Sequence, residues 1–288
     1  RIVMTLALLL TYGVAIFAAS LLGAWLPRRF HMTHTRTQLT MSLVAGLMLG
    51  AAFFHLIPHS VTSRGSDIDF TMSWVVAGLV FMLLMLRLFH FHQHDFADGD
   101  VSCVHQADDH GHAIAHDHAH AVPSKSPFTW LGLLLGLSIH TIVDGIALGA
   151  VMRAESVDGA GVLGIGVFLA ILLHKPLDSL SIETVASASG LSARHRQFIS
   201  VMFAILCPVT AVAFWALVDP LQADIRLLPA ALAFSAGAFV CIALGDLLPE
   251  VQFHSHDRLK LTALFILGIA LAVAIGVLEP THGLAHAQ

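Results

Sequence analysis

The sequence predicts an all-α integral membrane protein with eight transmembrane helices, and three observations lead to this prediction. Of the 288 residues, 57% are hydrophobic and only 11% are charged, whereas a soluble globular protein carries about 25% charged residues. The mean hydropathy is +0.81. The apolar residues gather in eight separate segments, each long enough to cross a bilayer. We therefore expect residues 1–288 to form a single transmembrane domain.

The lengths of the eight segments match the thickness of a membrane. A hydrocarbon core about 30 Å thick requires roughly 20 consecutive apolar residues in a helix. The first segment is too long for the apolar region of a signal peptide, so we interpret it as a spanning helix. The fifth contains Pro176, which lacks a backbone donor and is expected to kink the helix. The predicted spans are about 2–26, 38–60, 70–90, 128–152, 160–188, 197–218, 227–249 and 259–278.

The basic residues of the connections are unevenly divided between the two sides of the membrane. With eight spans both termini share a side, which holds Arg1, Arg64, Arg153 and Arg226. Cytoplasmic loops are enriched in Lys and Arg, so the side with the larger basic set faces the cytoplasm and both termini are extracytoplasmic. We expect a multi-pass protein of a plasma membrane, with a composition typical of a bacterial inner membrane. The larger set comprises Arg28, Arg29, Arg36, Arg87, Lys125, Arg194, Arg196, Arg258 and Lys260.

The longest connection, residues 91–127, lies between the third and fourth spans and is rich in histidine. It has almost no apolar periodicity, so we expect a disordered cytoplasmic loop. His-rich tracts commonly bind metal, and a solvated linker of low complexity is the alternative interpretation. The candidate metal-binding histidines of the loop are His92, His94, His105, His110, His112, His116, His118 and His120.

Several other classes of partner receive no support from the sequence. Cys103, Cys207 and Cys241 are scattered without CxxC spacing, which indicates neither a disulfide framework nor a thiolate zinc site. No block of basic residues suggests nucleic acid, and no nucleotide-binding motif or site for an organic cofactor is apparent. The expected partners are therefore divalent metal ions and the lipid bilayer.

Two His-x3-Asp pairs stand near the middle of consecutive spans. His140 and Asp144 lie in the fourth span, and His174 and Asp178 lie in the fifth. Residues four apart share a helix face, so each helix presents one imidazole and one carboxylate together. A membrane histidine is commonly a helix–helix hydrogen-bond donor, but two matching pairs at one depth are poorly explained in that way. The set predicts a site for a borderline divalent ion such as Zn²⁺.

A lysine, Lys175, follows directly after the histidine of the fifth span. The alternative interpretation is a side chain that extends to the membrane–water interface, but the position of Lys175 near the middle of the span argues against it. We expect a fixed internal counter-charge that compensates Asp144 or Asp178 and repels a second metal ion.

These motifs resemble those of the ZIP (ZRT/IRT-like) family of metal transporters. That family has eight spans, extracytoplasmic termini and a His-rich cytoplasmic loop, with H-N-x-P-E/D-G in the fourth helix and H-E-x-P-H/E in the fifth. Here the fourth span reads HTIVDG from His140 and the fifth reads HKPLD from His174. The resemblance covers essentially the whole chain. It further implies that Met48, in the second span, lies beside the metal.

The chain departs from the family pattern at the positions of a second, adjacent metal. Better-known members use the residue after each motif histidine and a Glu before a proline of the sixth helix. This chain has Thr141, Lys175 and Cys207 at those places. The departures predict a site for a single ion, as in the branch of the family with His-Lys in the fifth helix.

Candidate residues also lie on either side of the pairs along the membrane normal. His55 and His59 are nearer the outside than Met48, so they are candidates to receive an ion at the entrance, and interfacial histidines without a role are the alternative. Asp67 and Asp69, in an outer loop, are candidates to attract cations.

The corresponding exit candidates lie toward the cytoplasm. Glu183 follows Asp178 on the fifth span, and the seventh span ends in a segment with Asp246 and Glu250 that resembles the exit region of the family. Polar residues at helix ends are the alternative interpretation.

The predicted function is import of a divalent transition metal, most readily Zn²⁺, into the cytosol, with Cd²⁺, Fe²⁺ and Mn²⁺ also compatible with the donor set. The resemblance adds a homodimer as a form in which family members often occur. An intramembrane zinc-dependent hydrolase is the first alternative, although no HExxH-type helix is present. A metal efflux transporter is the second, although such transporters of the cation-diffusion type normally have six spans.

Overall fold

A computed structural model describes residues 2–26, 34–88, 129–158, 164–218, 226–247 and 258–278. All regular secondary structure in these ranges is helical, as the sequence predicts. The His-rich segment 91–127 lies outside them, so its expected disorder remains a prediction.

Eight helices in the described ranges are long and apolar enough to cross a membrane, which agrees with the eight predicted spans. Two of the eight contain a π-helical turn, and π-helical turns in longer helices occur frequently at functional sites. The second span consists of α2 (His34–Ala51), the π-helical η2 (Ala52–Leu56) and α3 (Ile57–Thr62), and the seventh of α8 (Leu227–Ile242) and the π-helical η4 (Ala243–Leu247). The other six are α1 (Ile2–Trp25), α4 (Ile68–Leu88), α5 (Thr129–Asp158), α6 (Ile165–Ala188), α7 (Ala193–Leu217) and α10 (Arg258–Leu278).

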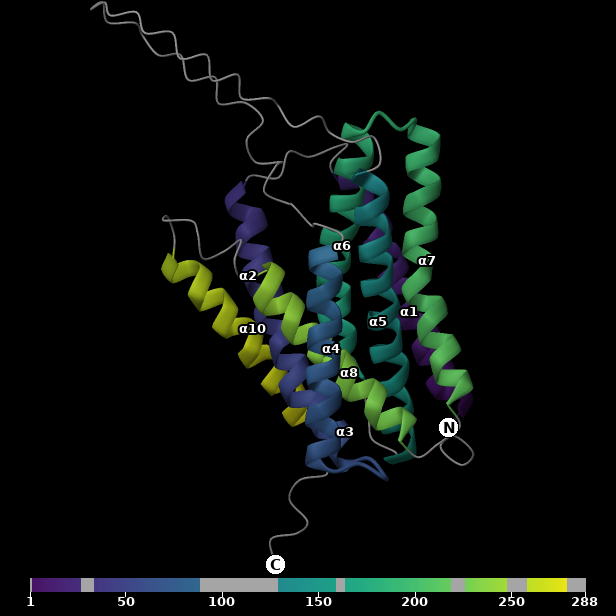
Figure 1. The fold of residues 1–288 in the computed structure, drawn as a ribbon, viewed down its shortest axis with the longest axis vertical. Helices are drawn as coiled ribbons and strands as arrows, with labels where there is room; N and C mark the ends of the chain where they lie inside the picture. Colours follow the sequence, from purple (N-terminus) through teal and green to yellow (C-terminus); the bar gives the residue numbers. More distant parts are fainter. Residues whose placement is uncertain are drawn as a thin grey trace, which may run out of the picture.

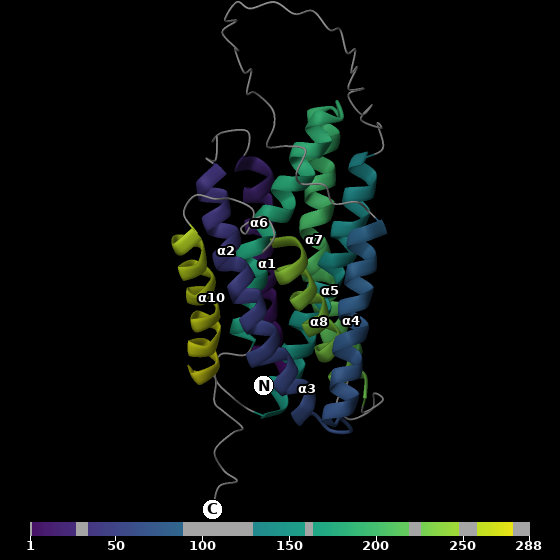
Figure 2. The same ribbon diagram turned by 60° about the vertical axis from the view of Figure 1, so that its left-hand side comes forward.

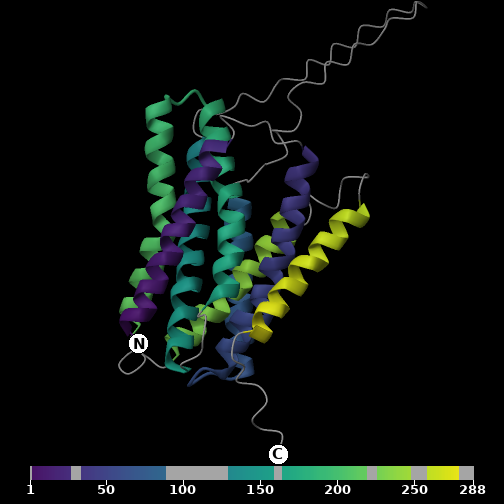
Figure 3. The ribbon, with the colours of Figure 1, turned by 180° about the vertical axis from the view of Figure 1, so that it is seen from behind.

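The helices form two groups that meet at the centre of the bundle. In the first group, α5 packs on α7, and α1 packs on both α6 and α7. In the second group, α2 packs along α10 and α4 packs along α8. Figures 1 and 3 show α10 at one edge of the bundle and α7 at the other. The groups touch where α8 contacts α5 and where α2 contacts α6.

The described ends of the chain lie at one end of the bundle. The first helix begins, and α10 finishes, at the lower end in Figure 2. We call this the N-terminal end, because α1, α4, α6 and α8 begin there, whereas α2, α5, α7 and α10 begin at the opposite end. The arrangement agrees with an even number of spans. Which side of a membrane each end faces remains a prediction from the distribution of basic residues.

Small residues allow the closest approaches between helices. A Cβ at Gly46 of α2 would lie 2.0 Å from the carbonyl oxygen of Phe265 in α10, and a Cβ at Gly268 of α10 would lie 2.2 Å from the carbonyl oxygen of Leu43. Packing of backbone on backbone through small residues is typical of helices in membranes. These two glycines therefore fix the distance between α2 and α10.

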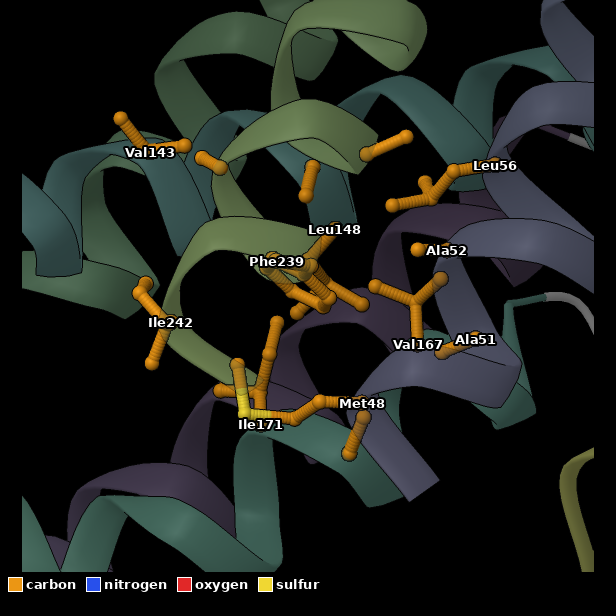
Figure 4. Packing of buried hydrophobic residues seen from close by; sticks show 14 of the residues in the cluster. Met48, Ala51, Ala52, Leu56, Val143, Leu148, Val167, Ile171, Phe239 and Ile242 are labelled. Carbon is orange, nitrogen blue, oxygen red and sulfur yellow. The ribbon is translucent and has the colours of Figure 1, made fainter. Parts of the chain in front are cut away.

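A tightly packed apolar layer fills the N-terminal half of the bundle centre. Its side chains come from both helix groups and have no solvent exposure. Figure 4 shows how they interlock beside Met48. We call this layer the apolar plug, and it consists of Ala52, Leu56, Leu148, Val167, Ile171 and Phe239.

The α2–α10 contact gives a prediction about stability. Gly46→Ala places a methyl group where backbone atoms of α10 already lie, so it should destabilise the protein by about 1–3 kcal/mol, the usual range for overpacking. The measurement is the thermal unfolding midpoint in detergent. Gly245→Ala is the matched control, because its new Cβ would meet only side-chain atoms at ordinary contact distance, Leu86 Cδ1 at 3.8 Å and Cys241 Sγ at 4.0 Å. Equal midpoints for the two variants would contradict the packing argument.

Candidate metal centre

The two predicted His-x3-Asp pairs come together at the contact between α5 and α6. His140 and Asp144 project from α5, and His174 and Asp178 project from α6. One ligand atom from each of the four residues can be chosen so that all lie within 4.8 Å of one another. The spacing of four residues places each imidazole on the same helix face as its carboxylate, one turn away, and the packing of the two helices brings the pairs face to face.

The distances within this cluster fit a tetrahedral divalent ion. His140 Nε2 lies 3.5 Å from Asp144 Oδ2 and 3.7 Å from Asp178 Oδ2. His174 Nε2 lies 3.2 Å and 3.8 Å from the same two oxygens. Nitrogen and oxygen ligands that are each about 2.0–2.2 Å from zinc lie roughly 3.3–3.6 Å apart in tetrahedral geometry. The donor atoms therefore already surround a space of suitable size for one ion.

The hydrogen bonding of the cluster leaves ligand atoms available. Among the described residues, both ring nitrogens of His140 and Oδ1 of Asp144 are buried without a hydrogen-bond partner. His174 is oriented by its Nδ1, which donates to the carbonyl oxygen of Ala170 at 2.7 Å. This hydrogen bond from Nδ1 leaves Nε2 facing the two carboxylates. In known metal sites, the ring nitrogen that does not bind the metal is often held by a carbonyl in the same way. Unsatisfied buried polar atoms are costly, and a bound cation would satisfy them.

Lys175 closes one side of the cluster. Its ammonium donates to Asp144 Oδ2 at 2.5 Å, to Asp178 Oδ2 at 3.2 Å and to Thr141 Oγ1 at 2.9 Å. Lys175 is only 1% exposed, so it does not reach an interface as a snorkelling lysine would. Lys175 also lies over the ring of Phe203 in α7, with Nζ 5.6 Å from the ring centroid. Cys207, on the same helix, is buried and is a free thiol.

A cavity extends from the cluster toward the end of the bundle that lies opposite to the N-terminal end. Asp144 is fully buried, whereas the side chain of Asp178 is 14% exposed. Met48 lines this cavity together with His140, His174 and Asp178, and its place beside a metal remains a prediction. Two further thioethers, Met41 and Met82, line it as well. The remaining lining residues are Leu86, Leu137, Leu177, Ile242 and Leu247.

The two entrance histidines have different surroundings. His55 lies in the π-helical turn η2, is 1% exposed and donates from Nε2 to the carbonyl oxygen of Ala272 in α10 at 2.9 Å. His59 lies one turn farther toward the N-terminal end, with Nε2 3.2 Å from Oε1 of Glu155 in α5. His55 thus joins two helices, whereas His59 faces a carboxylate.

The two acidic entrance candidates lie at the start of α4, away from the cluster. Asp67 is exposed and accepts a hydrogen bond from the backbone N–H of Phe70 at 2.8 Å, so it caps the helix. Asp69 is exposed in the first turn of the same helix, where a negative charge is favourable.

Only one of the exit candidates is described in full. Glu183 is 3% exposed, and its Oε1 lies 3.1 Å from Nε of Arg196 in α7. The backbone of Asp246 belongs to η4, but its side chain lies outside what the structure describes, as does Glu250. The same is true of the loop histidines His92, His94, His105, His110, His112, His116, His118 and His120.

Sequence reasoning did not identify Glu155, Met41 and Met82. The predicted fourth span ended at residue 152, but α5 continues to Asp158, so Glu155 lies on a helix and not in a loop. Its position 11 residues after Asp144 places it on the same face about three turns away, and this spacing was a usable signal. Met41 precedes Met48 by seven residues, or about two turns.

Comparisons with known proteins identify a family and several relatives of this chain. A family model described as ZIP zinc transporter matches residues 2–276. Zinc transporter ZIP9-A of Xenopus laevis is 31% identical over 220 residues, which cover 70% of this chain and 64% of that protein. Zinc transporter GufA of Myxococcus xanthus is 26% identical over 232 residues, which cover 79% and 82% of the two chains.

The family match covers nearly the whole chain, although the chain spans slightly less than two thirds of the Xenopus protein. Members of this family are transporters and not enzymes, in agreement with the predicted class of protein. The match includes both His-x3-Asp pairs and all eight candidate spans. This chain therefore belongs to the ZIP family of zinc transporters.

Proposed function

We propose that this protein transports Zn²⁺ across a membrane and that His140, Asp144, His174 and Asp178 bind the ion midway. The observation that carries the proposal is the convergence of these four donors, with ligand atoms within 4.8 Å of one another, in the middle of apolar helices. Ionisable groups at such depth in membrane proteins usually mark a path for an ion. Met48 lies beside the four residues in the same cavity and supplies a thioether for a fifth contact.

We further propose that the centre holds one ion at a time. Two ionised carboxylates, one ammonium and two neutral imidazoles give the metal-free cluster a net charge of −1. A divalent ion changes that charge to +1, and a second ion would raise it to +3 in a dry site, which is very unfavourable. Thr141 and Cys207 add no carboxylate that could lower this charge.

The direction we propose is import into the cytosol. The cavity leads from the cluster toward the opposite end of the bundle, which the distribution of Lys and Arg assigns to the cytoplasm. The apolar plug covers the cluster on the N-terminal side. An arrangement of this kind is suited to release an ion inward, and movement of one helix group against the other would expose the cluster to the outside.

On the cytoplasmic side, Glu183, Asp246, Glu250 and the His-rich segment 91–127 are proposed to receive the released ion. Glu183 is held by Arg196 in this arrangement, so it would bind an ion only after that pair opens. The membrane we propose is a plasma membrane.

Zn²⁺ is the preferred ion because imidazole, carboxylate and thioether ligands suit a borderline cation. Cd²⁺ shares this preference, and Fe²⁺ and Mn²⁺ are compatible with the oxygen and nitrogen donors.

The first prediction for the proposed transport concerns Asp144, the carboxylate at the centre of the cluster. Asp144→Asn keeps the shape but removes the charge that attracts the ion and Lys175. A loss of about 3 kcal/mol in binding corresponds to roughly 100-fold weaker affinity. We expect zinc flux into proteoliposomes at low zinc to fall by about that factor, whereas Asp144→Glu should retain part of it. Unchanged flux in Asp144→Asn would exclude this cluster as the transport site.

The second prediction concerns Lys175, which competes with the ion for the two carboxylates. Lys175→Gln should destabilise the metal-free protein by about 3–5 kcal/mol, the range for an unpaired buried charge. Zinc should then raise the unfolding midpoint by more than it does in the unmodified protein, because the ion replaces the missing cation. Lys175→Arg is the control that keeps the charge. An equal or smaller zinc-dependent shift in Lys175→Gln would contradict the counter-charge role.

The third prediction concerns direction. Cells that express the protein should accumulate radiolabelled zinc faster than cells that express Asp144→Asn, because the ion moves inward down its gradient. Reduced zinc in the expressing cells would instead support efflux. Competition by Cd²⁺, Fe²⁺ and Mn²⁺ in the same assay ranks the ions.

A further inference from the structure

A second pair of potential metal ligands, His59 and Glu155, lies at the N-terminal end of the bundle. His59 Nε2 and Glu155 Oε1 are 3.2 Å apart, with the side chains 20% and 6% exposed. The other carboxylate oxygen, Oε2, accepts a hydrogen bond from the backbone N–H of Gly164 at 2.6 Å. Gly164 has a φ of +64° and directly precedes α6 as its N-cap, so this turn fixes the orientation of the carboxylate.

The contact between these two residues is not an ordinary hydrogen bond. Among the described residues, Glu155 Oε1 is buried without a hydrogen-bond partner, although His59 Nε2 lies within 3.2 Å of it. The two atoms are close but poorly aligned for a shared proton. Their separation is close to the roughly 3.3 Å that a nitrogen and an oxygen ligand show when both bind one zinc ion. The two nitrogen–oxygen distances to Asp144 Oδ2 in the central cluster, 3.2 Å from His174 Nε2 and 3.5 Å from His140 Nε2, are similar.

The positions of the pair on their helices connect it to the central site. Glu155 follows Asp144 by 11 residues on α5, and His59 follows Met48 by 11 residues on the second span. On α5 this spacing is about three turns, so both carboxylates share one face and lie about 16 Å apart along the axis. The apolar plug fills the space between them, with Leu56 and Leu148 fully buried.

We propose that His59 and Glu155 form a separate binding site for a divalent transition metal ion at the N-terminal end of the path. The binding itself does not depend on transport, but the role of the site in capturing ions before they cross the plug rests on the proposed function. Two protein ligands leave the remaining positions of the ion to water, so the site is weaker than the central one and releases its ion readily.

Zinc titration of the purified full chain in lipid nanodiscs tests whether the site exists. Asp144→Asn weakens the central site equally in both proteins that we compare, namely this variant and the double variant Asp144→Asn/Glu155→Gln. The His-rich segment is present in both proteins, so any zinc that it binds cancels when the numbers of bound ions are subtracted. The double variant should bind one weakly held zinc ion fewer per chain. Equal numbers of weakly bound ions in the two proteins would overturn the proposal.

Two substitutions of His59 distinguish a metal site from a simple ion pair that closes the outer end. His59→Lys supplies a positive charge opposite Glu155 but cannot bind zinc as an ammonium, so it should lose the weak ion as Glu155→Gln does. His59→Cys supplies a thiolate and should gain cadmium–thiolate charge-transfer absorption above the background of the native cysteines. Retention of the weak ion in His59→Lys, or no added absorption in His59→Cys, would show that the pair has no metal-binding role.

The transport assay then tests the capture role. Loss of a residue that only orients a metal ligand already weakens affinity about 10–100-fold, so loss of a ligand in Glu155→Gln or His59→Lys should raise the half-saturating zinc concentration by at least about tenfold, with nearly full flux at saturation. His195→Gln, which changes an exposed histidine of α7, is the control and should leave both values unchanged. An unaltered half-saturating concentration in Glu155→Gln and His59→Lys would overturn capture by this site.

The two proposals fail in different ways. If flux is absent from the unmodified protein while the weak ion still depends on Glu155, the proposed transport is wrong and the site stands. If flux depends on Asp144 but neither flux nor the weak ion depends on Glu155, the transport proposal stands and the second site is wrong.

Discussion

The carboxylate of Asp144 imposes the strongest constraint on this molecule, because it lies fully buried among helices built for lipid. A buried charge without partners is very costly. Three groups therefore converge on its Oδ2, namely the ammonium of Lys175 and the Nε2 atoms of His174 and His140. These groups come from two helices, so the register of α5 against α6 is set by the need to satisfy one oxygen. The hydrogen bond from Lys175 to Thr141 fixes the same register from the other side.

The division of the helices into two groups gives this cluster a further property. All four donors and Lys175 belong to α5 and α6, which pack with α1 and α7. Much of the cavity wall comes from α2, α4 and α8 of the other group, including Met41, Met48 and Met82. A relative movement of the groups would therefore change the access to the ion without separating its four main ligands. In such a site the four ligands and Lys175 stay together, so the net charge of the cluster is unchanged whichever side of the membrane the cluster is open to.

The sequence predicts best what depends on neighbours along the chain. The eight spans follow from apolar length, and the His-x3-Asp pairs follow from helical spacing, so both were recognisable. The π-helical turn η2, the extension of α5 to Glu155 and the pair of Glu183 with Arg196 depend on contacts between distant segments. The role of His55 shows the same limit, because its partner is a backbone carbonyl of α10 that no side-chain pattern could reveal.

The order of polar and apolar layers along the path determines how an ion can move. The His59–Glu155 pair and the central cluster offer polar ligands, but the apolar plug between them offers none to replace the water that an ion must shed. An ion cannot rest in that layer, since an unsolvated charge in an apolar medium costs tens of kcal/mol in the limit of no relaxation. The transport that we propose therefore requires this layer to open for each ion that passes. Leu56 and Phe239 belong to the helix group of α2, α4, α8 and α10, whereas Leu148, Val167 and Ile171 belong to the other group. Separation of the two groups would therefore move these two sets of side chains apart and open the plug.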